Sequence, residues 1–359
     1  MSNVLSVVQE LDLGKIKGGK GARIFIGDEE YIDMFCDNGV VSLGYNYQPA
    51  GLPHTPGMLN DDLRDEAAER LCFQSGLDYA FFSNSGTESV EAMIKFARKA
   101  QEDRQEIYFL DGTFHGRTYG TMSADFTGKS YHLEGFEPFL PGIMRFKKIE
   151  DINPEAVAVI ITPAEVYGDF IKYPEKFIND LVDYCDENDI LLGFDEVQTY
   201  LRTGEWFGYE MYEKEFKPDM IAMAKGVAGG LPTGVTLVNE KIGNKISMGS
   251  HYSTFGGNRR SAQGIIDVHK SGEDIRRKVK LDGDYIKKRL KKMDVKNIRG
   301  EGLILAFDVD EPLKLRDKCL KENVILGVFS NNQSIKLTPP LVITRSVLVK
   351  ALDVIEKCL

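Results

Sequence analysis

The chain has 359 residues, of which 42% are hydrophobic and 28% are charged, so it is long enough for one large hydrophobic core or two modest domains. Its 45 basic and 55 acidic side chains leave a formal net charge of −10, which disfavours nucleic acid and anionic membranes as partners. No segment approaches the roughly 20 apolar residues of a transmembrane helix, and the first residues lack a secretory signal. The five cysteines contain no C-x-x-C pair, so we predict a cytoplasmic protein without a disulfide framework.

The first predicted element is a β-hairpin. Residues 23–35 (RIFIGDEEYIDMF) alternate in polarity around a GDEE turn, as two antiparallel strands do. From Tyr79 onward the chain instead shows short apolar runs separated by helical segments; the runs are YAFFSN, EIYFLD, VAVIIT, ILLGFDE, MIAMA and GVTLV. Strands that are apolar throughout and alternate with helices are typical of a mostly parallel sheet covered by helices on both faces. The predicted fold class is therefore α/β.

The last hundred residues show a different pattern. A helical pattern over residues 258–293 is followed by two predicted strand regions, RGEGLILAFDVD and SIKLTPP, and by an amphipathic helix over residues 344–359. This order predicts a smaller α/β domain that both chain ends build around a large central one. We place the N-terminal part of the small domain at residues 1–58, the large domain at 59–257 and the C-terminal part at 258–359.

Four motifs follow predicted strands, and open α/β sheets bind ligands at the carboxyl ends of their strands. The first motif is FFSNSGTES, in which Ser85, Gly86 and Thr87 lie between a strand and a helix. The free N–H groups and the positive dipole end of such a helix favour a phosphate. The plainer interpretation is an ordinary helix cap with Glu88 in the first turn.

The second and third motifs bring an acid and a lysine. GFDEVQT places Asp195 and Glu196 at the end of a buried strand, where a carboxylate needs a cation such as a protonated heterocycle, unless Asp195 only caps the next turn. In MIAMAKGVAGGLPTG, Lys225 follows an apolar strand, so lost solvation lowers its pKa and makes it a candidate Schiff-base former. Most lysines are solvated surface residues, but the neighbours here are apolar or glycine.

The fourth motif, DGTFHGRTYG, presents Phe114, His115 and Arg117 in a loop that contains three glycines. A ring in this loop can stack on a planar cofactor, and Arg117 can bind a carboxylate. Taken alone, a single loop histidine is more often solvated than functional.

Two other patterns are set aside. TGKS at Thr127 resembles the end of a P-loop, but Ser123 stands where that pattern requires glycine, so we do not expect nucleotide hydrolysis. The five histidines show no metal-ligand spacing, and we expect no dedicated metal site.

Together, the four motifs fit one cofactor, pyridoxal 5′-phosphate, which needs a phosphate cup, a carboxylate for its ring nitrogen, a lysine for its aldehyde and a side chain against its ring. The sequence resembles the class-III pyridoxal-phosphate-dependent aminotransferases, most closely the acetylornithine/ornithine branch. The resemblance rests on the blocks FFSNSGTESVEAMIKFARKA, DGTFHGRTYGTMSA, GFDEVQT, RTGEWFGYE, PDMIAMAKGVAGGLPTG and STFGGNRRSA and covers most of the chain. It implies the fold-type I architecture, in which a large domain binds the cofactor beside a small α/β domain.

The resemblance also implies roles for residues around the cofactor ring. Lys225 would bind the cofactor aldehyde and later move the substrate proton, and Asp195 would pair with the pyridinium nitrogen. Val197 and Phe114 would pack on opposite faces of the ring, with Gln198 near the phenolic oxygen. Lys225 and Asp195 are therefore the predicted catalytic residues.

Further roles concern the phosphate and the substrate. Ser85, Gly86 and Thr87 would hold the phosphate, and Thr254 would reach the phosphate bound by the neighbouring subunit, so the resemblance implies a homodimer. Substrate contact is implied for Arg117 and Ser253.

Two departures from the family pattern lie on the substrate side. The family usually has a Q-G-E-G-type segment after the strand VAVIIT, whereas this chain reads TPAEVYGDF, with Glu165 and Asp169 as stand-ins for the missing glutamate. The arginine that usually precedes the L-x-P-P-L turn is Lys336 in this chain. Because a lysine cannot form the bidentate fork of an arginine, we expect carboxylate binding by Lys336 to be weaker or differently shaped.

These observations give two catalytic hypotheses. The first is a transaminase that moves an amino group between a primary amine or amino acid, similar to ornithine or acetylornithine, and a 2-oxo acid such as 2-oxoglutarate, whose carboxylates Arg117 and Lys336 would bind. The alternative is an amino-acid racemase, epimerase or aminomutase, which the altered substrate side favours because an isomerase needs no second substrate. A non-catalytic relative is disfavoured, since Lys225 and Asp195 are both present.

Overall fold

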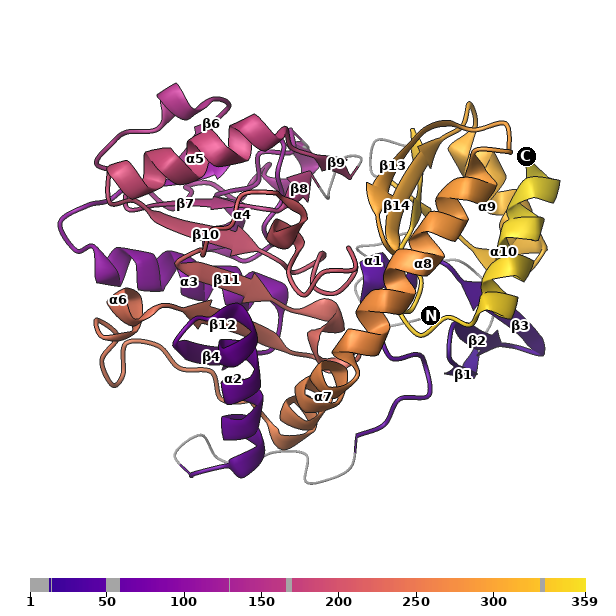
Figure 1. Ribbon diagram of the computed structural model, residues 1–359, viewed down its shortest axis with the longest axis horizontal. Coiled ribbons are helices and arrows are strands. Elements are labelled where there is room, and N and C mark those ends of the chain that lie inside the picture. The colour runs from indigo at the N-terminus through magenta and orange to yellow at the C-terminus, as the bar shows by residue number, and fades with distance from the viewer. Residues whose placement is uncertain (1–12, 14, 50–58, 129, 166–169, 330–332) are drawn as a thin grey trace.

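The computed structural model describes residues 13, 15–49, 59–128, 130–165, 170–329 and 333–359. Its largest sheet has seven strands in the order β4-β12-β11-β10-β7-β5-β6 (Figure 1). These strands are β4 (Tyr79–Ser83), β5 (Ile107–Leu110), β6 (Ile143–Phe146), β7 (Ala158–Ile161), β10 (Leu191–Asp195), β11 (Met220–Met223) and β12 (Gly234–Val238). The pairs from β11 through β6 are parallel, and β12 is antiparallel to both β11 and β4. The predicted mostly parallel α/β sheet is confirmed.

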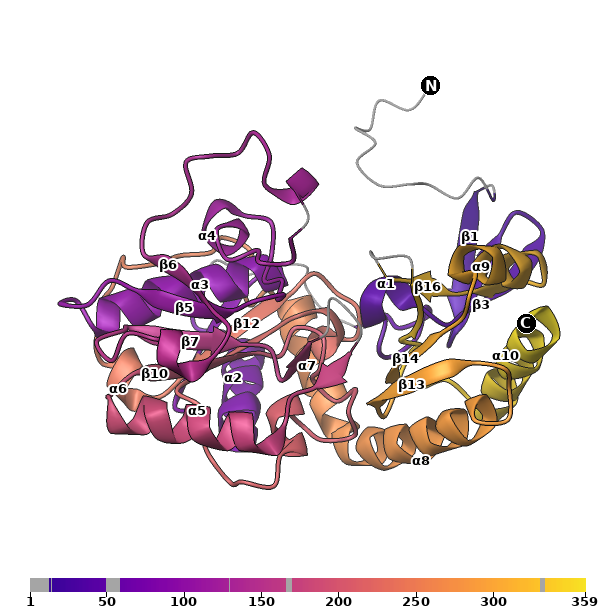
Figure 2. The ribbon, with the colours of Figure 1, turned by 90° about the horizontal axis from the view of Figure 1, so that it is seen from above.

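Helices cover both faces of this sheet. Successive strand residues point to opposite sides, so Ile160 packs in a buried cluster with Met93 of one helix, whereas Val159 packs in a second cluster with Ile178 of another. Figure 2 shows these two helices on opposite sides of the sheet. A strand covered on both faces has to be apolar throughout, which explains the uninterrupted apolar runs of the sequence. The two helices are α3 (Gly86–Ala100) and α5 (Glu175–Glu187).

Two further sheets have four strands each; the first combines strands from both ends of the described chain, and the second contains only C-terminal strands. One has the order β1-β2-β3-β15 and the other the order β13-β14-β17-β16. The predicted hairpin is the antiparallel pair β2–β3, and β15 pairs with β3 in parallel through Val324 and Ile32. The strands are β1 (Ile16–Lys20), β2 (Arg23–Ile26), β3 (Glu29–Asp33), β13 (Lys296–Glu301), β14 (Ile304–Asp308), β15 (Val324–Ile325), β16 (Gly327–Val328) and β17 (Ser334–Leu337).

The helical pattern predicted over residues 258–293 comprises two helices, α7 (Arg259–Lys270) and α8 (Gly272–Leu290). A Cβ atom on Gly272 would lie 2.0 Å from the Trp206 ring, so the junction packs too closely on this ring for any larger residue. The other helices and short elements are α1 (Cys36–Gly39), α2 (Asp62–Ser75), α4 (Tyr119–Met122), α6 (Glu240–Gly243), α9 (Pro312–Lys321), α10 (Arg345–Cys358), β8 (Ala164–Glu165), β9 (Ile171–Lys172), and the 3-10 turns η1 (Ser130–His132), η2 (Ile149–Asp151), η3 (Gly208–Met211) and η4 (Lys225–Ala228). Among the described helices, none has both the length and the apolar character needed to span a bilayer.

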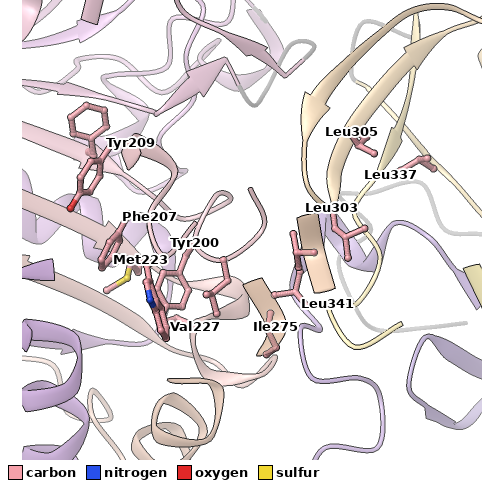
Figure 3. Close-up of a cluster of buried hydrophobic side chains, with 14 of the residues drawn as sticks. Tyr200, Phe207, Tyr209, Met223, Val227, Ile275, Leu303, Leu305, Leu337 and Leu341 are labelled. Atoms are coloured by element: carbon pink, nitrogen blue, oxygen red, sulfur yellow. The ribbon is translucent and has the colours of Figure 1, made fainter. Parts of the chain in front are cut away.

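A continuous hydrophobic cluster joins the region of the central sheet to the C-terminal strands. Figure 3 shows it extending from Tyr209 and Phe207 through Ile275 and Leu303 to Leu337. Its outer members, Phe207 and Leu337, are more than a hundred positions apart in the sequence, so the cluster fixes the two parts of the chain against each other by burial of apolar surface.

One buried arginine adds polar links to this junction. Arg202 is 2% exposed, and its guanidinium donates hydrogen bonds to the carbonyl oxygens of Leu303 at 3.1 Å, Pro339 at 2.9 Å and Gly39 at 2.8 Å. Burial lowers the pKa of Arg202 to about 10. Main-chain dipoles thus stabilise the buried charge, and one side chain connects an N-terminal, a central and a C-terminal segment.

Candidate active site

A cavity of about 420 Å³ lies at the carboxyl ends of β10 and β11, where the sequence motifs meet. It is of the size that small-molecule sites usually have. Nine of the predicted site residues line it: Ser85, Gly86, Thr87, Phe114, Arg117, Asp195, Val197, Gln198 and Lys225. Segments that lie far apart in the sequence therefore converge on one cavity, as the carboxyl-end rule for open sheets predicts.

Lys225 follows β11 and begins the turn η4 with a left-handed backbone, at a φ of 47°. Burial is the main cause that lowers its pKa, and the nearby carboxylates of Asp195 and Asp37 partly oppose this shift. A lowered pKa increases the fraction of neutral amine, which is the form that attacks an aldehyde or accepts a proton. The direction of this pKa shift is the one that the sequence predicted, and the role of Lys225 as the aldehyde-binding amine stays a prediction.

Asp195 ends β10 and is 5% exposed. Its Oδ1 accepts a hydrogen bond from the N–H of Val197 at 3.1 Å, and its Oδ2 accepts one from Nδ1 of His115 at 2.8 Å. His115 is buried as well, and its Nε2 lies 3.0 Å from Oγ1 of Thr113. The plainer alternative of a solvated loop histidine is therefore wrong, because the loop after β5 turns inward and His115 reaches Asp195 at the end of β10. No local sequence signal distinguishes this histidine from an exposed one.

The start of α3 forms the wall that was predicted to hold a phosphate. Ser85 is the N-cap, with its Oγ accepting from the N–H of Glu88 at 3.4 Å and donating to the Glu88 carboxylate at 2.7 Å. The cap interpretation is thus correct for Ser85. A Cβ atom on Gly86 would lie 2.8 Å from Val197, so glycine allows the helix start to approach the other wall of the cavity. The first N–H groups of a helix have no partner within the helix and can bind an anion here.

Thr87 connects this helix start to the loop that carries Arg117. Its Oγ1 accepts from the N–H groups of Arg117 and Thr118, both at 3.2 Å, and lies 2.7 Å from Oγ1 of Thr121. The Glu91 carboxylate, one turn further along α3, accepts from the N–H groups of Gly120 at 2.8 Å and Thr121 at 3.3 Å. The start of α3 and the loop that carries Arg117 are therefore held together.

Lys336 lies on β17, is 3% exposed, and is not among the residues that line the cavity. Its Nζ donates to Oε1 of Gln198 at 2.9 Å and lies 4.9 Å from the centre of the Phe329 ring. Burial, together with the charges of Lys225 and Arg202, holds its pKa well below the usual range. Lys336 therefore contacts the cavity through the amide of Gln198.

Three other predicted residues, Ser253, Thr254 and Glu165, are not among the residues that line the cavity. Ser253 accepts a hydrogen bond from Nδ2 of Asn84, a lining residue, at 3.1 Å, and Thr254 is exposed. Glu165 is partly buried in β8, and Asp169 lies outside the described residues. Of the segment TPAEVYGDF, which departs from the family pattern, the described residues thus include Glu165 but not Asp169.

Comparisons with known proteins agree with this geometry. The family described as "Aminotransferase class-III" matches residues 13–359. The acetylornithine aminotransferase of Aquifex aeolicus is 34% identical over 371 residues, which cover 96% of this chain and 97% of that protein. The acetylornithine aminotransferase of Lactococcus lactis is 32% identical over 384 residues and is covered completely.

A solved structure shows the same fold at lower sequence identity. The ornithine aminotransferase of Toxoplasma gondii superposes with a TM-score of 0.89 at 22% identity, covering 98% of this chain and 91% of that one. The predicted fold-type I architecture is confirmed by this similarity. On the family match and the relatives together, the chain belongs to the class-III aminotransferases, a family of pyridoxal-phosphate-dependent enzymes.

Proposed function

We propose that this aminotransferase takes its amino group from a primary amine or amino acid that resembles ornithine or acetylornithine, and passes it to a 2-oxo acid such as 2-oxoglutarate. The observation that carries the proposal is the convergence of Lys225, Asp195 and Arg117 on one cavity. The names of the relatives support the substrate class, because two that match over nearly their whole length are acetylornithine aminotransferases.

The residues present fit pyridoxal 5′-phosphate. Asp195 is a buried acceptor of the kind that a pyridinium nitrogen needs, and Lys225 has the lowered pKa of an aldehyde-binding amine. Gly86 leaves space beside Val197 that a Cβ atom would fill, and Phe114 lines the same cavity. We propose that the start of α3, with Ser85, Gly86 and Thr87, holds the phosphate. When bound, the cofactor supplies an electron sink for the bond that breaks at the substrate carbon.

Lys225, Asp195 and Arg117 then have separate roles in the reaction. The Lys225 amine removes and returns a proton at the substrate carbon, because its lowered pKa leaves a neutral form available. His115 and the N–H of Val197 hold both oxygens of Asp195, so this carboxylate keeps its position while charge develops. Arg117, which lines the same cavity, binds a substrate carboxylate.

Ser253 and Lys336 complete the proposed substrate side. Ser253 contacts the cavity through Asn84, and Lys336 acts on the acceptor carboxylate through Gln198, whose Oε1 it holds. Because Lys336 is a buried ammonium or amine rather than an arginine fork, this end of the site suits weaker or differently shaped carboxylate contacts.

The proposal includes a cytoplasmic homodimer in which Thr254 reaches the phosphate site of the neighbouring subunit. Thr254 is exposed in the single chain and is flanked by exposed aromatic side chains, Tyr252 at 65% and Phe255 at 61%. Large exposed apolar side chains beside a functional loop are typical of an interface. We also retain the division into residues 1–58 plus 258–359 and residues 59–257, which the pairing of β3 with β15 supports.

The test is an absorbance spectrum of the purified holoenzyme between about 300 and 500 nm, recorded before and after amines are added without acceptor. Loss of the visible band with ornithine or acetylornithine, and its return with 2-oxoglutarate, would establish both substrates. The racemase or aminomutase alternative predicts instead a band that persists while the α-hydrogen exchanges with solvent deuterium. Protein that shows no visible band after incubation with the cofactor would contradict the cofactor assignment.

A further inference from the structure

The guanidinium of Arg117 is bonded to a buried histidine that the sequence motifs did not include. Nη2 of Arg117 lies 3.0 Å from Nε2 of His132, and Nδ1 of His132 lies 2.5 Å from Oδ2 of Asp125. His132 is 4% exposed and Asp125 is 3% exposed, although Arg117 itself is exposed. The buried pair of His132 and Asp125 is thus bonded to an exposed arginine that lines the cavity.

Chemistry fixes which atoms donate and which accept in the hydrogen bonds that link Arg117, His132 and Asp125. An arginine can only donate, so Nε2 of His132 must accept, and the ring proton must lie on Nδ1 and be donated to Asp125. His132 is therefore a neutral imidazole in one tautomer. A neutral ring leaves the charge of Arg117 uncompensated for a ligand, and the bond uses only one of the five N–H groups of the guanidinium.

Other contacts hold Asp125 and Arg117 in place. Oδ1 of Asp125 accepts from the N–H of Thr127 at 3.0 Å and from its hydroxyl at 2.6 Å, so the carboxylate cannot rotate freely. The Phe114 ring lies 5.4 Å from the Arg117 guanidinium and 5.9 Å from the His132 ring, at an interplanar angle of 62° to that ring. The guanidinium is therefore held by a hydrogen bond and by an aromatic face.

We propose that His132, oriented by Asp125, is a positioning residue that holds the Arg117 guanidinium ready for the substrate carboxylate and so sets the affinity for carboxylate-bearing substrates. An exposed arginine loses rotamer freedom when it binds a ligand, and a side chain that is already held loses less. The inference rests on the proposed function, in which Arg117 contacts that carboxylate.

The first experiment measures steady-state kinetics with a saturating amine and a varied dicarboxylate acceptor. His132→Ala is expected to raise the acceptor KM about tenfold with little change in kcat, the effect of losing about one hydrogen bond to a charged group. His132→Gln is expected to restore most of the affinity, because its amide oxygen can accept from Arg117. An unchanged KM in folded His132→Ala, or no recovery in folded His132→Gln, would overturn the proposal.

A double-mutant cycle separates this proposal from the assignment of Arg117 itself. If His132 acts through Arg117, then His132→Ala should have no further effect on the acceptor KM in an Arg117→Ala background. Equal effects in both backgrounds would overturn the positioning role. If Arg117→Ala alone left the acceptor KM unchanged, the substrate role proposed for Arg117 would fail instead, and the second experiment would then decide the state of His132.

The second experiment does not depend on activity. Nitrogen-15 NMR of histidine-labelled protein at neutral pH is expected to show the His132 ring in the neutral Nδ1–H form, assigned by the signal that His132→Gln removes. An Nε2–H tautomer or a doubly protonated ring would contradict the donor and acceptor roles on which the proposal depends.

Discussion

Two groups of residues that line the cavity are held in different ways; we call Gly86, Asp195 and Lys225 the floor, and Arg117 and Gln198 the rim. The floor residues stand at the ends of two adjacent strands and at the start of one helix. The rim residues are held by partners elsewhere in the chain, Arg117 by a histidine 15 positions away and Gln198 by a lysine 138 positions away. The ends of strands and of one helix therefore place the residues predicted for cofactor chemistry, although His115, 80 positions away, also holds the side chain of Asp195. The side chains that we propose for substrate selection depend on partners in a loop and on β17. Floor variants should change kcat, and rim variants should change KM.

The largest expected effect comes from the floor. Lys225→Ala removes the amine that binds the aldehyde and moves the proton, so kcat should fall by at least about 10³-fold. Stopped-flow single turnovers with the amine donor would measure this. A rate within about tenfold of the wild type would show that another group performs the proton transfer.

Asp195→Asn tests the second floor residue. The amide keeps the shape but cannot hold the charge of a pyridinium partner, so kcat should fall by about 10²-fold with a smaller change in KM. The matched control is Glu196→Gln, because Glu196 is the next residue but does not line the cavity. A similar loss of kcat in both variants would mean that the effect comes from packing rather than from the charge of Asp195.

Glu196, the residue after Asp195, is buried and accepts hydrogen bonds from two main-chain N–H groups. Its Oε2 accepts from the N–H of Gly208 at 2.8 Å and its Oε1 from the N–H of Tyr209 at 3.0 Å, and burial raises its pKa from the ordinary 4.5 to about 7. The folded state thus binds a proton more tightly than the unfolded state. The stability that this contributes is complete below about pH 4.5 and is lost as the pH rises through about 7.

The corresponding prediction compares urea unfolding at pH 5 and pH 8. The free energy of unfolding of the wild type should decrease over this interval by roughly 2 kcal/mol more than that of Glu196→Gln, which cannot titrate. Identical pH dependence in the two proteins would show that Glu196 has an ordinary pKa.

The smallest effect is expected at the rim. Lys336→Arg places a longer, forked cation behind Gln198, so the KM for a dicarboxylate acceptor should fall by about threefold, with kcat unchanged. Lys176→Arg, on the exposed surface of α5, is the control for the general effect of the exchange. An unchanged KM would mean that the carboxylate does not reach this residue and that Lys336 only holds Gln198.

The sequence predicted the floor well because each of its residues follows a rule of short range. A charged residue directly after an apolar strand, as at Asp195 and Lys225, has to lie at the carboxyl edge of a buried sheet. The central sheet was predictable for the same reason, since its strands are apolar throughout. The seven-strand order and the antiparallel β12 were not, because pairing between strands depends on contacts that no local pattern records.

The contacts of the rim residues and of the buried histidines could not be predicted from the sequence. His115 and His132 have no neighbours in sequence that mark them as buried, and their partners are brought to them by loop folding. Lys336 was predicted to bind a carboxylate, and only the structure shows that its Nζ donates to Oε1 of Gln198. Arg202 was part of a recognised block, yet its carbonyl partners lie in segments that the sequence could not bring together.

The bonding of Arg202 also determines which substitutions its surroundings can accept during divergence. Its acceptors at positions 303 and 339 are main-chain oxygens, so exchanges of the Leu303 or Pro339 side chain need not break these bonds. Position 39 differs, because its φ is +84° and a Cβ atom there would lie 2.2 Å from Nε of Arg202. Glycine at 39 and arginine at 202 should therefore be inherited as a pair, while the hydrogen bonds at the other two contact positions do not depend on which side chain stands there.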